Sequence, residues 1–396
     1  MRAGLGFLVA GYVLSQFYRA FLAVLAPVLD AEIGVRPEDL AISSGLWFLA
    51  FAVMQMPVGW ALDRIGPRRT TAVLLAIGGG GGAAVFALAQ GPMALHLAMV
   101  LIGIGCSPVL MASYYIFARM FSPAIFGTLA GAIIGVGSLG NIAGAAPLAA
   151  LVELAGWRET LWGLTAVTLL VAGAIWRLVQ DPPRVGDGGK SEGSVFDLLR
   201  VPGMWAIMIL MAVAYAPAAS IRGLWAGPYI GQVFGADAGT IGTVTLGMAL
   251  AMVAGNFAYG PVDRIFRSKK WPVFGGNVLG ALCLAVLWLA PDAGIWTAAA
   301  LLAGLGLFGA SFPAIMSHAR AFFPPHLVGR GVTFINMFGI GGAGLMQFAS
   351  GRVFAAAGGD VPGGDVAGAY GVLFLYFLVP LVMGLVLYLF SRDSRG

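Results

Sequence analysis

The chain has 396 residues, of which 60% are hydrophobic and only 10% are charged, and its mean hydropathy is +0.92. This composition excludes an ordinary soluble domain and predicts an all-α integral membrane protein. The formal net charge of +5 does not predict a nucleic-acid partner, because the basic residues are spread over many short loops and form no single patch.

Apolar stretches recur along the whole chain, and each is close to the roughly 20 residues that an α-helix needs to cross about 30 Å of hydrocarbon. The sequence predicts twelve transmembrane helices, at 4–29, 40–62, 70–90, 93–118, 124–150, 156–178, 203–231, 239–261, 272–290, 293–318, 328–354 and 367–391. A polar connector separates the sixth helix from the seventh. The predicted organisation is an N-terminal six-helix bundle (1–180), a cytoplasmic linker (181–200) and a C-terminal six-helix bundle (201–396).

The basic residues also predict the orientation of the chain. Only Arg36, Arg158 and Arg352 fall on one side, and Arg19 and Arg222 fall at membrane depth, whereas all other lysines and arginines fall on the opposite side. Cytoplasmic loops carry the excess of positive charge. We therefore expect both termini in the cytoplasm and a multi-pass protein of the bacterial inner (plasma) membrane.

The sequence contains an internal repeat. The triplet Asp63-Arg64-Ile65 recurs 200 residues later as Asp263-Arg264-Ile265, and Ala118-Arg119 recurs 201 residues later as Ala319-Arg320. Arg19 and Arg222 are 203 residues apart. These similar offsets predict two pseudo-symmetric halves of the same fold.

The loop after the second predicted helix reads Gly59-Trp60-Ala61-Leu62-Asp63-Arg64-Ile65-Gly66-Pro67-Arg68-Arg69. It resembles the G-x-x-x-D-R-x-G-R-[RK] signature of the major facilitator superfamily, with Pro67 where arginine is usual. The resemblance implies two bundles that rock about a midplane site. It also implies a cytoplasmic gating latch, for which the candidate residues are Gly59, Asp63, Arg64, Arg68, Arg69, Asp263 and Arg264. The alternative is that these charges only fix the topology.

Arg19 and Arg222 are the strongest candidates for a functional site, because an arginine at mid-bilayer depth costs from roughly 3 to more than 10 kcal/mol. Each follows a tyrosine by seven residues, Tyr12 and Tyr215, which would share its face of an α-helix. On the same reasoning, Gln16 falls on the face of Arg19, and Tyr229 on that of Arg222. The full set of predicted substrate-binding residues is Arg19, Arg222, Tyr12, Gln16, Tyr215, Trp225, Tyr114, Tyr115 and Asn141. The alternative is that the arginines bond carbonyls freed by Pro27, Pro217 or Pro228.

Two resemblances within the superfamily favour an anionic substrate. Residues 137–144, GSLGNIAG, are similar to a signature of nitrate/nitrite porters, although the arginines that those porters carry on the second and eighth helices are absent here. The segment around Arg19 is similar to organic-anion porters, which also place an arginine on the first helix but usually add a nearby aspartate. The guanidinium fork suits a planar oxyanion.

We therefore predict a secondary transporter, an antiporter or symporter, that moves a small anion such as an organic carboxylate or nitrate by alternating access. No acidic residue lies deep in any predicted helix, which argues against a carboxylate that carries a proton. The alternatives are an exporter of hydrophobic or cationic compounds from the same superfamily, and a non-transporting membrane sensor or scaffold. We expect no enzyme activity, metal or cofactor, and we expect a functional monomer whose partners are the anionic substrate and membrane lipids, with no nucleic acid.

Overall fold

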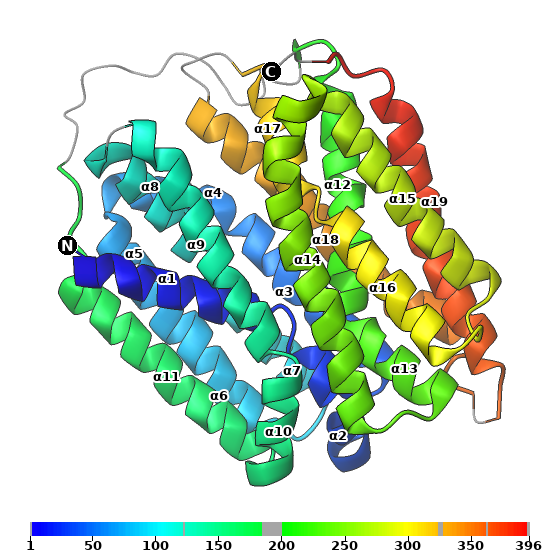
Figure 1. Ribbon diagram of the computed structural model, residues 1–396. Helices are drawn as coiled ribbons and strands as arrows, with labels where there is room; N and C mark the ends of the chain where they lie inside the picture. Colours follow the sequence, from blue (N-terminus) through cyan, green and yellow to red (C-terminus); the bar gives the residue numbers. More distant parts are fainter. Residues whose placement is uncertain (1, 122, 184–199, 324–327, 362, 394–396) are drawn as a thin grey trace. The chain divides into compact units, whose positions relative to one another are not determined.

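The computed structural model describes residues 2–121, 123–183, 200–323, 328–361 and 363–393, and every regular element in these ranges is helical (Figure 1). The chain divides into two compact units, Met1–Gly186 and Asp187–Gly396. Most of the predicted linker at 181–200 lies outside the described residues. The domain boundaries of the sequence analysis therefore stay a prediction.

The helices carry the labels of Figure 1. In the first unit they are α1 (Arg2–Phe17), α2 (Leu22–Ile33), α3 (Pro37–Val53), α4 (Gln55–Arg64), α5 (Pro67–Leu74), the π-helical η1 (Leu75–Gly80), α6 (Gly81–Ala87), α7 (Pro92–Cys106), α8 (Val109–Met120), α9 (Pro123–Ala143), α10 (Ala146–Ala155) and α11 (Trp157–Leu178). In the second unit they are α12 (Met204–Ser220), the π-helical η3 (Ile221–Trp225), α13 (Ala226–Phe234), α14 (Ala238–Phe266), α15 (Lys270–Leu289), α16 (Ile295–Gly309), α17 (Phe312–Arg320), α18 (Val328–Ala356) and α19 (Val366–Tyr388).

The predicted membrane spans correspond to these helices. Within the described residues, nine helices are long and apolar enough to cross a membrane, and two bent pairs raise the number to eleven. The remaining predicted span corresponds to α18, a helix of 29 residues. The fold is that of an all-α membrane protein with twelve transmembrane segments.

Two spans that the sequence predicts as single stretches are bent. The first breaks between α1 and α2 by 51°, and the fifth breaks between α9 and α10 by 42°. Pro147, in the first turn of α10, accounts for the second break, because it has no N–H to bond the carbonyl of Ala143 at the end of α9. At the first break, the i→i+3 bonds from Arg19 N to Gln16 O and from Ala20 N to Phe17 O replace regular α-helical bonding.

The two units repeat one packing pattern. In the first unit α1 packs against α9, α3 against α7, and α6 with η1 against α11. In the second unit α12 packs against α18, α14 against α16, and α15 against α19. In both units, therefore, the first span packs on the fifth, the second on the fourth and the third on the sixth, as expected for a duplicated sequence.

Glycines allow the first and fifth spans of each unit to approach closely. A Cβ atom at Gly140 would overlap the carbonyl oxygen of Val13, and one at Gly342 would overlap that of Ala212. Gly137 and Gly339 lie three residues earlier on the same helices. A Cβ atom at Gly137 would overlap the ring of Tyr12, and one at Gly339 would overlap the ring of Phe312. Small residues are typical where membrane helices pack with their backbones in contact.

An aspartate at the end of the last span of each unit caps the start of the third span. Asp181 Oδ1 accepts a hydrogen bond of 2.7 Å from the backbone N–H of Arg68 at the N-terminus of α5. Asp393 Oδ1 accepts one of 3.2 Å from the backbone N–H of Lys270, and its Oδ2 accepts one of 2.7 Å from Ser268 Oγ. A carboxylate at a helix N-terminus satisfies exposed N–H groups and complements the helix dipole.

We expect Gly140→Ala and Gly342→Ala each to lower the free energy of unfolding by about 1–3 kcal/mol, because the added methyl group must displace a backbone carbonyl. Thermal unfolding of the purified protein in detergent measures this effect. The matched control is Gly163→Ala on α11, where a Cβ atom meets no neighbouring atom within 4 Å and alanine is the better helix former. An equal loss in all three variants would contradict the close approach of these helices.

Candidate functional site

Arg19 lies in the turn Tyr18–Phe21 that separates α1 from α2, and only 9% of its surface is exposed. Within the described residues, no carboxylate lies at ion-pair distance from its guanidinium, and its buried Nε atom has no hydrogen-bond partner. Broken helices at membrane depth are the usual place of substrate sites in secondary transporters.

Two aromatic rings of α3 cover the guanidinium of Arg19. Its Cζ atom lies 5.1 Å from the ring centroid of Trp47 and 5.0 Å from that of Phe51. The two rings stack on each other with centroids 5.2 Å apart. Sequence reasoning missed both residues, although their i, i+4 spacing in the segment Trp47-Phe48-Leu49-Ala50-Phe51 is a detectable signal. Each ring stabilises the cation through its quadrupole but does not neutralise the charge.

Tyr12 and Gln16 lie on α1, about two turns and one turn before Arg19 respectively. Gln16 Nε2 donates a hydrogen bond of 2.8 Å to Tyr12 Oη, as the predicted polar face requires. Asn141 lies on α9 beside Gly140, which contacts the backbone of α1 at Val13 and Phe17. Its side chain is 8% exposed, and its Oδ1 atom has no partner in the part of the chain that the structure describes. These three predicted residues therefore lie on the two helices that position Arg19.

Arg222 lies in the π-helical turn η3, and 4% of its surface is exposed. A π turn inside an α-helix inserts an extra residue and is frequent at functional sites. Arg19 and Arg222 therefore occupy irregular turns at matching places in the two repeats. Because η3 is π-helical, residues seven apart across it do not share one helix face as they would in an α-helix. The spacing of Tyr215, Arg222 and Tyr229 therefore does not by itself place them on one face.

The aromatic residues near Arg222 are held by other contacts. Tyr215 packs edge to face against Phe312, with centroids 5.1 Å apart. Trp225 is fully buried, and its indole nitrogen donates to Ser350 Oγ at 3.0 Å. Tyr229 donates to the carbonyl of Pro291. Trp225 and Tyr229 therefore both have partners within the second unit, and the role of Trp225 in substrate binding stays a prediction.

Gln347 is a buried residue of α18 that sequence reasoning missed. It is 0% exposed, and neither polar atom of its amide has a hydrogen-bond partner in the described ranges. On α18, Gln347 lies between Gly342 and Ser350. Gly342 contacts the backbone of Ala212, and Ser350 accepts a hydrogen bond from the indole of Trp225. These two contacts place Gln347 alongside the segment that contains η3. No motif marks it, because a single glutamine in an apolar helix is common where helices pack.

The tyrosines of α8 have different surroundings. Tyr114 is partly buried on α8, a helix that packs against α1. The ring of Tyr115 packs against the apolar cluster of Val58, Leu62 and Ala112 and lies 4.3 Å from Arg119 Cζ. These contacts place the ring of Tyr115 against α4, and its role in substrate binding stays a prediction.

The predicted latch residues lie on α4, α5, α14 and the Gly66 turn. Gly66, at φ +104°, is the N-cap of α5, and Arg68 Nε lies 3.7 Å from Asp181 Oδ2. The side chains of Asp63, Asp263 and Arg264 lie outside the described residues, so their roles remain predictions. Gly59 lies in open space on α4, while Arg64 and Arg69 are exposed. Asp181 is a partner of this loop that the motif did not include.

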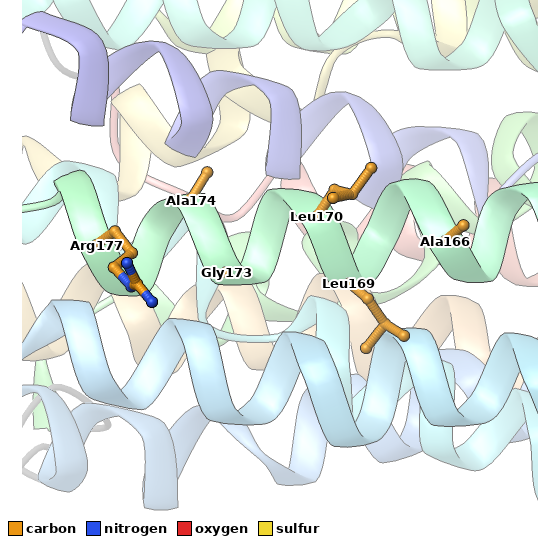
Figure 2. Close-up of a pocket in the computed structure, with 6 residues that line it drawn as sticks. All are labelled: Ala166, Leu169, Leu170, Gly173, Ala174 and Arg177. Carbon is orange, nitrogen blue, oxygen red and sulfur yellow. The ribbon is translucent and has the colours of Figure 1, made fainter.

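A groove on the outer face of α11 is not part of this candidate site. Figure 2 shows its lining, which is apolar except for Arg177 at the end of the helix. Leu170 and Leu169 form much of the surface, and none of the predicted substrate-binding residues contributes to it. Exposed apolar side chains are expected on a helix that faces lipid.

Comparisons with known proteins agree with this architecture. A model of the Major Facilitator Superfamily matches residues 8–225. The "Uncharacterized transporter YybO" of Bacillus subtilis is 27% identical over 180 residues, which cover 46% of this chain and 41% of the relative. The "Probable sulfoacetate transporter SauU" of Cupriavidus necator is 26% identical over 165 residues, which cover 42% and 38%. A "Quinolone resistance transporter" of Acinetobacter baumannii is 25% identical over 188 residues, which cover 43% and 41%. The matches thus span about two fifths of each relative.

Solved structures show the same fold over nearly the whole chain. A bacterial homolog of the human lysosomal transporter Spinster superposes with a TM-score of 0.79 at 17% identity and covers 97% of this chain and 95% of its own. A D-xylose–proton symporter superposes with a TM-score of 0.74 at 14% identity and covers 98% of both chains. Because the family model matches more than half of the chain, the protein belongs to the Major Facilitator Superfamily, and its helices are those of a multi-pass membrane protein.

Proposed function

We propose that this transporter carries a small organic anion by alternating access, and that the anion neutralises Arg19 and Arg222 during transport. The observation that carries the proposal is the buried guanidinium of Arg19, which has aromatic neighbours but no carboxylate at ion-pair distance within the described residues. The position of Arg222 in the matching turn of the other repeat supports it.

The energetics of burial favour an anionic ligand. Each of the two rings stabilises the guanidinium by about 0.5–2 kcal/mol, and by more when the pair is desolvated. The cost of a guanidinium at membrane depth is roughly 3 to more than 10 kcal/mol. Together the two rings offset about 1–4 kcal/mol, which is less than most of that range, and an oxyanion that accepts two parallel hydrogen bonds from the guanidinium fork would supply the rest.

Charge balance favours two modes of transport. Arginine does not lose its proton at physiological pH, and the sequence places no acidic residue deep in a span. A buried guanidinium at Arg19 that no anion neutralises resists reorientation across the membrane. The carrier therefore exchanges one anion for another, or moves an anion together with its own cation. The relative described as a probable sulfoacetate transporter is consistent with an organic anion.

Export of larger hydrophobic compounds is the second candidate. The similarity to a quinolone resistance transporter favours it, over a similar share of the chain. Such a substrate would not require the two buried guanidinium groups. In that case stabilisation by hydrophobic or cationic compounds, with no response to small anions, would replace the anion proposal.

We expect Arg19→Gln and Arg222→Gln each to reduce the affinity for the transported anion at least tenfold, and the double variant to lose transport in proteoliposomes. A ligand at a hundredfold excess over Kd stabilises a protein by about 2.7 kcal/mol, so thermal shifts with acetate, succinate, methanesulfonate and sulfoacetate measure the affinity. Lysine variants keep the charge but lose the fork, so we expect intermediate affinity.

The matched control for these variants is Arg158→Gln. Arg158 Nη1 donates to the carbonyls of Ala87 and Ala89 at 2.9 and 3.0 Å, and its guanidinium lies 4.2 Å from the ring of Trp157. This variant should lower the unfolding temperature and leave the anion affinity unchanged. Wild-type transport by the Arg19→Gln, Arg222→Gln double variant would refute the proposal.

A double-mutant cycle tests whether Phe51 stabilises the charged form of Arg19. We expect Phe51→Leu and Arg19→Gln to show a coupling of about 0.5–2 kcal/mol in unfolding experiments, because each variant alone removes the cation–π contact. Phe86 packs against Phe21 and Trp157 with no cation in contact, so Phe86→Leu should show no coupling to Arg19. Zero coupling for Phe51 would contradict the assigned contact.

A further inference from the structure

Trp47 has a buried N–H group that no acceptor satisfies. Its side chain is 1% exposed, and its Nε1 atom has no hydrogen-bond partner in the described parts of the chain. An unsatisfied buried donor normally costs about 1–3 kcal/mol, so such groups are rare and need an explanation. Other tryptophans of this protein satisfy the same atom: Trp157 donates to Glu32 and Trp225 donates to Ser350.

The unsatisfied indole lies beside an unsatisfied guanidinium. The Cζ atom of Arg19 is 5.1 Å from the Trp47 ring centroid, and the buried Nε atom of Arg19 also has no partner. Both groups are donors only. Two adjacent donors without acceptors cannot satisfy each other, whereas a ligand with several acceptor oxygens can satisfy both. The ring contacts of Trp47 with Phe48 and Phe51 hold the indole in place before a ligand arrives.

We propose that the indole N–H of Trp47 is a substrate-binding group, which donates a hydrogen bond to one oxygen of the anion while the guanidinium of Arg19 donates to another. This inference rests on the proposed anion transport. It adds a requirement on the ligand, because a carboxylate or sulfonate has two or three oxygens that can bridge the two donors. A monatomic anion such as chloride offers one acceptor atom, so it cannot pair with the two parallel N–H bonds of the guanidinium fork and reach the indole N–H at a separate position, and we expect it to bind more weakly.

Trp47→Phe tests this assignment because it removes the N–H group and keeps an aromatic face for Arg19. In the full-length wild-type protein, acetate, methanesulfonate or sulfoacetate raises the unfolding temperature. In Trp47→Phe we expect the affinity for the same anion to fall at least tenfold, or about 1.4 kcal/mol. The variant should unfold at the wild-type temperature or above it in the absence of anions, because an unsatisfied donor has been removed.

Two further variants separate hydrogen bonding from packing. Trp47→His restores an N–H donor on an aromatic ring, so we expect part of the affinity to return. Trp157→Phe is the matched control: its indole bonds Glu32, so this variant should lose stability and keep the anion affinity. If Trp47→Phe misfolds, the Trp47→His variant and the ratio of oxyanion to chloride affinity in the wild type still decide the question.

The outcomes distinguish this inference from the proposed function. Wild-type anion affinity in Trp47→Phe, with weak binding in Arg19→Gln, would overturn the role of Trp47 and leave the anion site in place. Equal affinity of the wild type for chloride and for methanesulfonate would also overturn it. If no anion stabilises the wild type, both the role of Trp47 and the anion transport fail.

Discussion

The constraint on which this structure depends is a cation buried in apolar helices. Arg19 is 9% exposed, no carboxylate of the described residues lies at ion-pair distance from it, and the faces of Trp47 and Phe51 contact its guanidinium. Aromatic faces orient a guanidinium and lower its energy by a small part of the burial cost. In the proposed function, a bound anion would supply the remaining stabilisation of the guanidinium. This arrangement differs from Arg158, where two carbonyl oxygens at a helix end satisfy the guanidinium permanently.

Arg19 and Arg222 both lie where the backbone departs from a regular α-helix. The turn Tyr18–Phe21 and the π turn η3 interrupt the first span of each unit, where a continuous helix would satisfy all its backbone groups internally. Irregular turns at membrane depth are tolerated where the protein or a cavity surrounds them. Glycines on the neighbouring fifth span hold these irregular helices at short distance: Gly140 contacts Val13 and Gly342 contacts Ala212. The position of each arginine is therefore fixed by backbone packing on one side.

The charged groups at the ends of the helices have a different role from the buried arginines. Asp181 and Asp393 cap the third span of their units, and Lys270 Nζ donates to the carbonyls of Leu389 and Ser391 beyond the end of α19. These bonds join the third and sixth spans within one unit. They therefore stabilise each unit separately.

The sequence by itself determined the membrane class, the twelve spans and the two repeats, because hydropathy and the positions of basic residues depend on local composition and chain order. It also identified Arg19 and Arg222, since a charged residue in an apolar stretch is visible without coordinates. It did not identify Trp47, Phe51, Asp181 or Gln347, whose significance depends on which side chains they meet across other helices. It also did not identify the partner of Trp225, because Ser350 lies 125 residues away in the chain. Only the tertiary structure decided which buried polar groups are satisfied, since a hydrogen bond depends on distance and direction between segments that the sequence keeps far apart.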